Sequence, residues 1–226
     1  IEATLDYQIV RTRKWGVGFN FNIGFNRSLV IDVPGAELLF DPKVVPGSGS
    51  IVTIRNGGSL GQWYGYQVEG VFKSQEEIDA LPDDYESLSV KKANLRPGDH
   101  KFFDYTGDNK ITTDDKMVLG SGEPLFSGGF GLNGDYKGFS ISTIFQFSYG
   151  SKIFNANLAT LEAGRDSYNQ TRRLMDAWTP TLYSGDGTVV DEGNPDGTFR
   201  MNGGGPENYL LSTFLEDGSF LRFSDL

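Results

Sequence analysis

The stretch FSGGFGLNGDYKGFSISTIFQFSY, residues 126–149, alternates large apolar residues with small polar ones on both sides of DYKG (135–138). Successive side chains of a strand point to opposite faces of a sheet. The alternation therefore places the aromatic rings on one face and mostly Ser, Gly, Asn and Gln on the other. DYKG has the composition of a tight hairpin turn. The stretch predicts two antiparallel strands joined by that turn.

Two segments nearer the start of the chain repeat the pattern. Apolar and polar residues alternate from Ala3 to Ile9, and rings alternate with Asn and Gly from Phe19 to Phe25. The polar positions of all four segments carry almost no Lys or Glu, whereas the solvent face of a soluble sheet usually carries more charge. Small uncharged polar residues suit the wet interior of a membrane barrel whose rings face lipid.

The links between these segments alternate between short (11–16 and 135–138) and very long (27–123 and 150–217). Loops beyond ~12–15 residues are unusual in compact domains, but membrane barrels have short turns at one end and long loops at the other. We therefore expect an all-β fold, an antiparallel transmembrane β-barrel segment whose long extracellular loops contain short helices. The expected divisions are two strands with a short periplasmic turn (1–27), a long extracellular loop (28–123), a barrel hairpin (124–149), a second long extracellular loop with a helix (150–217) and the start of the next strand (218–226). Trp15 and Tyr136 fall at the short turns, where an interfacial aromatic belt is expected.

Composition excludes several classes of site. The chain has no cysteine, one histidine (His100) and a formal net charge of -10. Thiolate zinc sites, disulfides and cysteine nucleophiles are absent, and the acidic balance argues against a nucleic-acid partner. No stretch approaches the ~20 apolar residues of a membrane helix. Because no leader sequence precedes the first strand pattern and the last one is incomplete, we expect the chain to begin and end inside a longer polypeptide.

The long loops contain two helical patterns. SQEEIDAL (74–81) begins with Ser74 followed three residues later by Glu77, a capping box that predicts a short helix. Tyr168, Arg172, Met175 and Trp178 have the spacing of one helix face, and this second helix is expected to end before Pro180.

The segment DYTGDNKITTDD (104–115) matches a twelve-position calcium loop. Its expected ligands are Asp104, Thr106, Asp108, the carbonyl of Lys110, Thr112 and Asp115. Ile111, at position eight, is expected to anchor the loop to a core. Thr106 is a neutral ligand, Asn109 stands where glycine is usual but tolerates the left-handed conformation, and Asp115 replaces the usual glutamate. We therefore expect weak binding of a structural Ca²⁺; the alternative is an acidic turn that matches by chance.

Trp63, Tyr64 and Tyr66 are candidates for stacking on sugar rings or peptide side chains, with local packing as the alternative. GFGLNG (129–134) spells a dinucleotide fingerprint, but it lies inside a strand and is followed by a hairpin, so we reject that function. The acidic pairs at 83–84 and 191–192 are adjacent loop carboxylates, and we do not assign them a glycosidase role.

Five stretches together resemble the SusC/RagA-type TonB-dependent transporters. They are GQWYGYQVEGVFKSQEEID (61–79), PGD (97–99) before the calcium-like loop, YKGFSIS with FQ (136–142, 145–146), RR with WTP (172–173, 178–180) and FLEDGSFLR (214–222). The matches occur in the order of the family, from about residue 17 to the end.

The resemblance implies part of the C-terminal half of a barrel in the bacterial outer membrane. It also implies membrane lipid around the barrel, a SusD-like lipoprotein lid, and a TonB complex that contacts parts of the protein outside this chain. The cargo would be an oligosaccharide or an oligopeptide, and the family argues against an enzyme. The alternative is a soluble, secreted, calcium-stabilised β-domain that binds or cleaves glycans.

Overall fold

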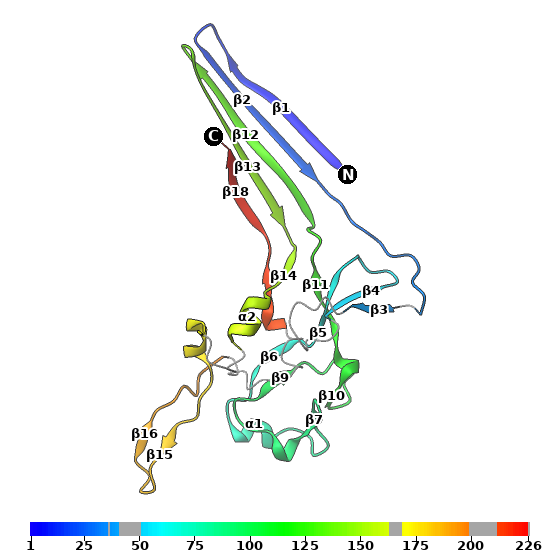
Figure 1. Ribbon diagram of the computed structural model, residues 1–226, viewed down its shortest axis with the longest axis vertical. Coiled ribbons are helices and arrows are strands. Elements are labelled where there is room, and N and C mark those ends of the chain that lie inside the picture. The colour runs from blue at the N-terminus through cyan, green and yellow to red at the C-terminus, as the bar shows by residue number, and fades with distance from the viewer. Residues whose placement is uncertain (36, 41–50, 163–168, 199–211, 226) are drawn as a thin grey trace.

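The computed structural model describes residues 1–35, 37–40, 51–162, 169–198 and 212–225. Figure 1 shows two parts: a long, narrow sheet, called here the wall sheet, and a smaller set of elements at one end of it, called the loop body. The loop body consists of the described residues of the two long links, 28–123 and 150–217. The turns at the other end of the wall sheet are short.

The wall sheet has five antiparallel strands. Their order is β1 (Glu2–Arg11), β2 (Trp15–Gly24), β12 (Phe126–Tyr136), β13 (Phe139–Tyr149) and β18 (Phe220–Asp225). The turn between β12 and β13 consists of Lys137 and Gly138, whose φ angles are 47° and 91°. Two positive φ angles give the turn the twist that suits a two-residue hairpin. The pairing confirms the predicted all-β, antiparallel fold class.

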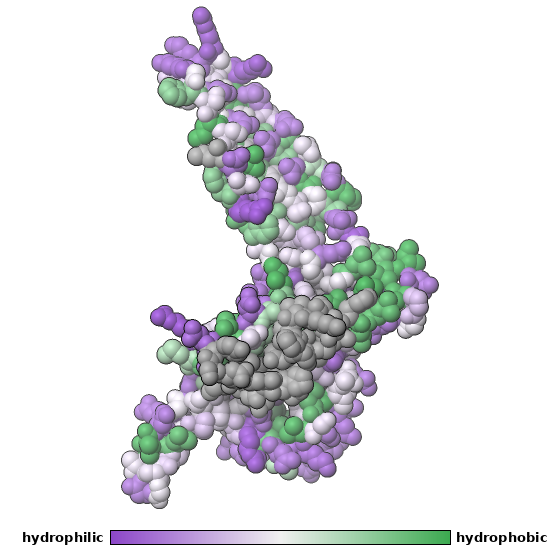
Figure 2. Space-filling model, in the orientation of Figure 1, coloured by the Kyte–Doolittle hydropathy of each residue, from purple (hydrophilic) through white to green (hydrophobic). Residues whose placement is uncertain are grey.

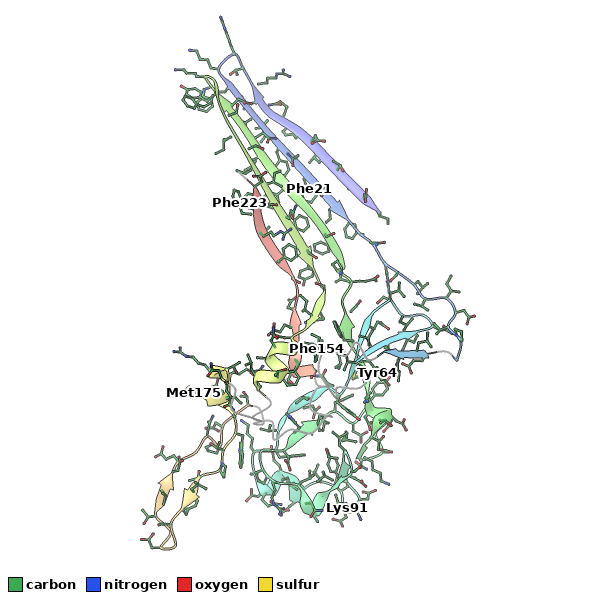
Figure 3. All side chains as sticks on the ribbon, in the orientation of Figure 1. Phe21, Tyr64, Lys91, Phe154, Met175 and Phe223 are labelled. Carbon is green, nitrogen blue, oxygen red and sulfur yellow. The ribbon has the colours of Figure 1, made fainter. Side chains whose placement is uncertain are left out.

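The two faces of the wall sheet differ as the alternation predicts. Register places five apolar residues in one row across the sheet: Leu5, Phe21, Phe130, Phe145 and Phe223. The neighbouring row, on the opposite face, contains Thr4, Asn22, Gly129, Gln146 and Arg222. Figure 3 labels Phe21 and Phe223 on this sheet.

One detail of the first strand differs from the alternation. The pairing of β1 with β2 shifts between Gln8 and Val10, so that Val10 rather than Ile9 lies opposite Val17. The Gln8 amide donates hydrogen bonds to the carbonyls of Val10 (2.8 Å) and Val17 (2.9 Å) across the irregularity. A bulge of this kind inserts one residue without changing the composition of the strand, so sequence alternation does not reveal it.

The loop body is built from short elements. Its strands are β3 (Glu37–Phe40), β4 (Val52–Arg55), β5 (Gln62–Gly65), β6 (Val68–Val71), β7 (Glu86–Ser87), β8 (Val90–Lys91), β9 (His100–Phe102), β10 (Lys110–Ile111), β11 (Met117–Ser121), β14 (Lys152–Phe154), β15 (Leu182–Tyr183), β16 (Val189–Asp191) and β17 (Leu215–Asp217). Its helices are α1 (Gln75–Asp79) and α2 (Ala156–Leu161), with 3₁₀ turns η1 (Lys92–Asn94), η2 (Thr113–Asp115), η3 (Arg172–Asp176) and η5 (Ser212–Phe214). The largest loop sheet has the order β11-β5-β4-β3.

Both long links contribute to one hydrophobic core in the loop body. Its buried residues include Phe72, Ile78 and Ile111 from the first link, and Ala159 and Phe214 from the second. Burying such side chains is the main stabilising term in folding, at about 25 cal/mol per Å² of apolar surface. The two links therefore pack as a single unit.

The predicted helices have different outcomes. The helix at Ser74 is confirmed: the Ser74 side chain accepts a hydrogen bond from the Glu77 amide, and α1 follows. The second prediction is wrong over its described part, because only the 3₁₀ turn η3 forms and Ala177 is extended, with ψ of 144°. Tyr168 lies outside the described residues. None of the helices in the described ranges is long and apolar enough to cross a membrane.

Candidate functional site

The polar face of the wall sheet contains a groove of about 480 Å³. Its lining includes Asn20, Asn22, Ser127, Gln146 and Ser148. These are uncharged side chains with hydrogen-bond donors and acceptors, as expected for a surface that contacts water or a polar ligand. The groove lies on the face that the alternation predicts to be the barrel interior.

Glycine gives the groove its depth. A Cβ atom at Gly131 would lie 2.8 Å from Oδ1 of Asn20 and 2.8 Å from the carbonyl oxygen of Thr143. Real Cβ atoms do not approach other atoms this closely, so any other residue would displace the Asn20 amide or separate the strands. Gly131 therefore makes room for the Asn20 amide in the groove.

Next to Gln146, which lines the groove, lies a cation. Arg222 on β18 donates hydrogen bonds from Nε (3.1 Å) and Nη2 (2.6 Å) to Oε1 of Gln146 on β13. Both donors bind one neutral amide oxygen, so the charge of the guanidinium is not neutralised and its other N–H groups can still donate hydrogen bonds. It is the one cation in the Thr4–Arg222 row, and sequence alternation did not single it out.

The three candidate aromatic residues do not share one open surface. Trp63 lies 5.8 Å from the ring of Phe154, centroid to centroid, and its Nε1 donates a hydrogen bond to the carbonyl of Lys152 (2.8 Å). Tyr66 is only 4% exposed and packs in the core at 5.6 Å from Phe102. Tyr64, labelled in Figure 3, is half-buried, and the Arg55 guanidinium lies 5.3 Å from its ring centre.

Beside Tyr64 lies a polar cluster that sequence reasoning missed. Glu37 Oε1 accepts hydrogen bonds from the Thr53 hydroxyl (2.6 Å) and from Nη2 of Arg55 (2.6 Å). The hydrogen bond from Thr53, and next to it the Arg55 charge, outweigh the effect of burial and hold the pKa of Glu37 below its ordinary value. These residues come from β3 and β4, whose four-residue strands are too short for a clear alternation.

The calcium-like loop is folded around Asp104. Its carboxylate accepts hydrogen bonds from the amides of Gly107 (2.6 Å) and Asn109 (2.7 Å). Asn109 has a φ of 64°, so it takes the left-handed conformation for which glycine is usual at this position. Ile111 is 1% exposed and anchors the loop in the core, as the pattern predicts.

Three of the six expected ligands come together in this loop. The Thr106 hydroxyl lies 3.3 Å from Oδ1 of Asp104 and 3.0 Å from Oδ1 of Asp115, and Asp115 is fully buried. Burial raises the pKa of Asp115, but hydrogen bonds from the amides of Thr112 and Thr106 outweigh it, so this pKa lies below its ordinary value. These bonds favour a charged carboxylate inside the loop.

The other expected ligands are less well placed. Asp108 Oδ1 accepts a hydrogen bond from the Lys110 amide (2.9 Å), and Thr112 Oγ1 lies 3.4 Å from Asp115. In the described ranges, no three acidic or histidine side chains converge on a point that would hold a metal ion. The donor set therefore fits calcium only in part, and calcium binding stays a prediction.

A contact between the two long links was also not predicted. Trp178 lies against Gly98, where a Cβ atom would be 2.4 Å from Cε3 of the indole. Nearby, the Lys73 ammonium donates a hydrogen bond to the carbonyl of Asp196 (3.1 Å). We call residues 171–198 the hairpin arm; Figure 1 shows its β15–β16 hairpin projecting from the loop body. These contacts fix the base of the arm.

The sequence matches curated proteins over most of its length. It is 30% identical to TonB-dependent receptor P3 of Formosa agariphila over 215 residues, which are 94% of this chain and 19% of the relative. It is 28% identical to TonB-dependent receptor P26 of the same organism over 98% of this chain and 20% of the relative. The chain is a homologue of the TonB-dependent receptors. It spans about a fifth of the length of these relatives. No protein-family model matches the sequence.

Solved structures resemble the fold of this chain. It resembles the RagAB peptide transporter with a TM-score of 0.62 and 18% identity, over 98% of this chain and 21% of that one. The closed-closed state of the RagAB peptide importer gives a TM-score of 0.59, with 19% identity over 97% of this chain and 21% of that one. The relatives are receptors and transporters by name, not enzymes, which agrees with the expectation from the sequence.

Proposed function

We propose that the chain forms part of the wall and of the extracellular loops of a TonB-dependent transporter in the bacterial outer membrane. The observation that carries the proposal is the two-faced wall sheet, apolar in one row and polar in the next, in a homologue of TonB-dependent receptors. The apolar face contacts lipid, and the polar face with its groove lines the interior. In this orientation the short turns lie in the periplasm and the loop body lies outside the cell.

The whole protein imports an oligosaccharide or an oligopeptide, covered by a SusD-like lipoprotein lid and energised by a TonB complex. The fold likeness to the RagAB peptide transporter supports the architecture, and the five sequence stretches that resemble SusC/RagA-type transporters support the lid. A polar interior rich in Asn, Ser and Gln suits both kinds of cargo, because hydroxyls and amides of either exchange hydrogen bonds with these side chains.

Deletion of the full-length gene tests this proposal. Uptake of labelled oligosaccharide and oligopeptide libraries is measured in the parent strain, the deletion strain and the deletion strain carrying the gene again. We expect one class of cargo to be lost on deletion, restored by the gene, and blocked by an ionophore that collapses the proton gradient. Unchanged uptake on deletion, or recovery of the gene product in the soluble secreted fraction, contradicts the proposal and favours the soluble glycan-binding alternative.

Of the three candidate aromatic residues, Tyr64 is the one whose replacement gives the clearest test of contact with cargo. Trp63 and Tyr66 also pack in the loop body, so replacing either mixes binding with folding. Tyr64→Leu keeps apolar volume but removes the hydroxyl and most of the stacking surface. We expect weaker cargo binding with unchanged melting of the receptor; equal binding by the parent and the variant removes Tyr64 from the cargo site.

Calcium is the second part of the proposal. We propose that Asp104, Thr106, Asp108, Lys110, Thr112 and Asp115 hold a structural Ca²⁺ that ties residues 104–115 to the core. We expect millimolar calcium to raise the melting temperature of the full-length receptor and Asp108→Ala to abolish the rise. Asp84→Ala, at an exposed acidic residue outside the loop, is the control. Equal melting with calcium and with a chelator removes the ion from the loop.

A further inference from the structure

The short-turn end of the wall sheet carries a cluster of cations in a chain that is acidic as a whole. Residues 7–17 and 133–143 contain four cations, Arg11, Arg13, Lys14 and Lys137, and one acid, Asp135, whereas the chain has a formal net charge of -10. All four cations are exposed, and none takes part in the ion pairs found in the described ranges. Figure 2 shows hydrophilic side chains projecting beyond this end of the sheet.

The two turns that display these cations are tied to each other. The Lys137 amide donates a hydrogen bond to the carbonyl of Lys14 (3.3 Å), and the Thr12 amide donates one to the carbonyl of Trp15 (2.7 Å). The Thr12 hydroxyl also accepts a hydrogen bond from the Trp15 amide (2.9 Å). Arg13, Lys14 and Lys137 are therefore held close together by ordered backbone.

An aromatic hollow lies directly beside the cations. It has a volume of about 380 Å³, and its lining includes Trp15, Val17, Tyr136, Phe139 and Ile141. The ring centroids of Trp15 and Tyr136 lie 4.1 Å apart, with the rings tilted by 35°, and Phe139 is 81% exposed. The Lys137 ammonium lies 5.2 Å from the centre of the Tyr136 ring, where the cation and the hollow meet.

The one carboxylate of this end, Asp135, is among the residues that line the hollow, and its single charge is smaller than that of the three turn cations. Register places Asp135 opposite Gly16 and Ser140, in a polar row, and its carboxylate accepts a hydrogen bond from the Ser140 hydroxyl (2.6 Å). Arg11 also lies opposite Gly16, in the same row. The cations next to the apolar face are therefore the three in the turns, Arg13, Lys14 and Lys137.

From this juxtaposition we propose that Arg13, Lys14 and Lys137, with the hollow at Trp15, Tyr136 and Phe139, bind an anionic glycerophospholipid of the inner leaflet of the outer membrane. The phosphate of the headgroup meets the three cations, and the glycerol and upper acyl chain fill the hollow. Positive residues beside an aromatic belt suit this ligand by charge complementarity. The orientation of the sheet, with its short turns inside, rests on the proposed function.

Native mass spectrometry of the full-length receptor in detergent tests the proposal. Phosphatidylglycerol and phosphatidylethanolamine with identical acyl chains are added separately, and bound lipid is counted over a range of concentrations. We expect preferential binding of phosphatidylglycerol. The variant Arg13→Gln/Lys14→Gln/Lys137→Gln should bind it about 100-fold more weakly, since each of the three cations near an anionic lipid contributes about fivefold. Binding of phosphatidylethanolamine should change little.

A matched variant controls for the loss of charge. Arg27→Gln/Lys91→Gln/Arg172→Gln removes the same charge from exposed residues outside the wall sheet and should keep the parent's preference. Lys137→Gln alone should weaken the binding of phosphatidylglycerol by a smaller factor. This single variant is used if the triple variant does not form a barrel, which is judged by heat-modifiable migration in gels. Trp15→Ala should weaken both lipids by removing one side of the hollow.

Four results overturn the proposal: equal binding of the two lipids by the parent, unchanged preference in the turn variant, equal losses in both triple variants, or displacement of the lipid by millimolar inorganic phosphate. The last would indicate a site for free anions. Cargo uptake by cells that carry the turn variant should equal that of the parent. A receptor that binds phosphatidylglycerol but imports nothing would refute the proposed function and leave the lipid site standing.

Discussion

Gly98→Ala should release the hairpin arm from the loop body. Gly98 has a φ of 93° and faces the Trp178 indole, with only 2.4 Å between an added Cβ atom and Cε3. A left-handed conformation costs a non-glycine residue about 1–2 kcal/mol, and overpacking of a tight contact costs about 1–3 kcal/mol. The backbone strain is present whether or not the arm is docked, so the docked arm should lose the overpacking cost, about 2 kcal/mol, which raises its undocked population by more than tenfold.

Limited proteolysis of the full-length receptor measures this undocking. Arg172 and Arg173 lie at the base of the arm in the 3₁₀ turn η3, and trypsin cuts there when the segment opens. We expect Gly98→Ala to raise the rate of cleavage at this site at least tenfold. Gly57→Ala is the matched control, because Gly57 also has a positive φ (79°) but its Cβ atom would meet nothing within 4 Å. Equal cleavage of the parent and both variants would refute the proposed contact between the two links.

Two further predictions concern the wall and the loop sheet. Phe145→Arg, in the apolar row near the middle of β13, should lower the free energy of unfolding of the full-length barrel by about 2–4 kcal/mol, as measured by urea unfolding from bilayers. Gln146→Arg, on the opposite face, should lower it little. Equal losses would mean that the apolar face does not contact lipid. Glu37 has a lowered pKa, so its carboxylate stabilises β3 and β4 above the ordinary pKa of glutamate and loses this effect as pH falls through the lowered value. Amide hydrogen exchange of these strands, corrected for intrinsic rates, should show a pH-dependent stability of about 1 kcal/mol in the parent and none in Glu37→Gln. The same pH profile in both proteins would show that Glu37 is not the group that stabilises these strands.

The wall sheet was predictable from the sequence because residues close together in the chain determine its strands and turns. In β12 and β13, each of eleven residues, alternation fixes the faces, and the two-residue link fixes the register. The bulge at Ile9 was not predictable, because an inserted residue leaves the local composition unchanged. The same reasoning recovered α1, where a capping serine and a glutamate lie in one turn.

The loop body was less predictable because its contacts join distant parts of the chain. Strand β5 pairs with β11, which lies more than fifty residues later, and strands of two to five residues show no reliable period. Trp178 had the spacing of a helix face, yet it lies in extended chain against Gly98, so a tertiary contact overrides the local pattern. In the calcium-like loop, by contrast, the spacing correctly placed Ile111 in the core and Asn109 in the left-handed conformation.

The wall sheet and the loop body are mechanically coupled, since paired strands run from one into the other. Strand β13 pairs with β18, and beyond Gly150 the same two chain segments pair again as β14 with β17. The Gly218 amide donates a hydrogen bond to the carbonyl of Ser151 (2.9 Å), which fills the step between the two ladders. Strand β11 likewise leads into β12 through four residues. Displacing the loop body would break several backbone hydrogen bonds at once. The arm, held at its base by Trp178, can therefore move at a lower cost than the loop body as a whole.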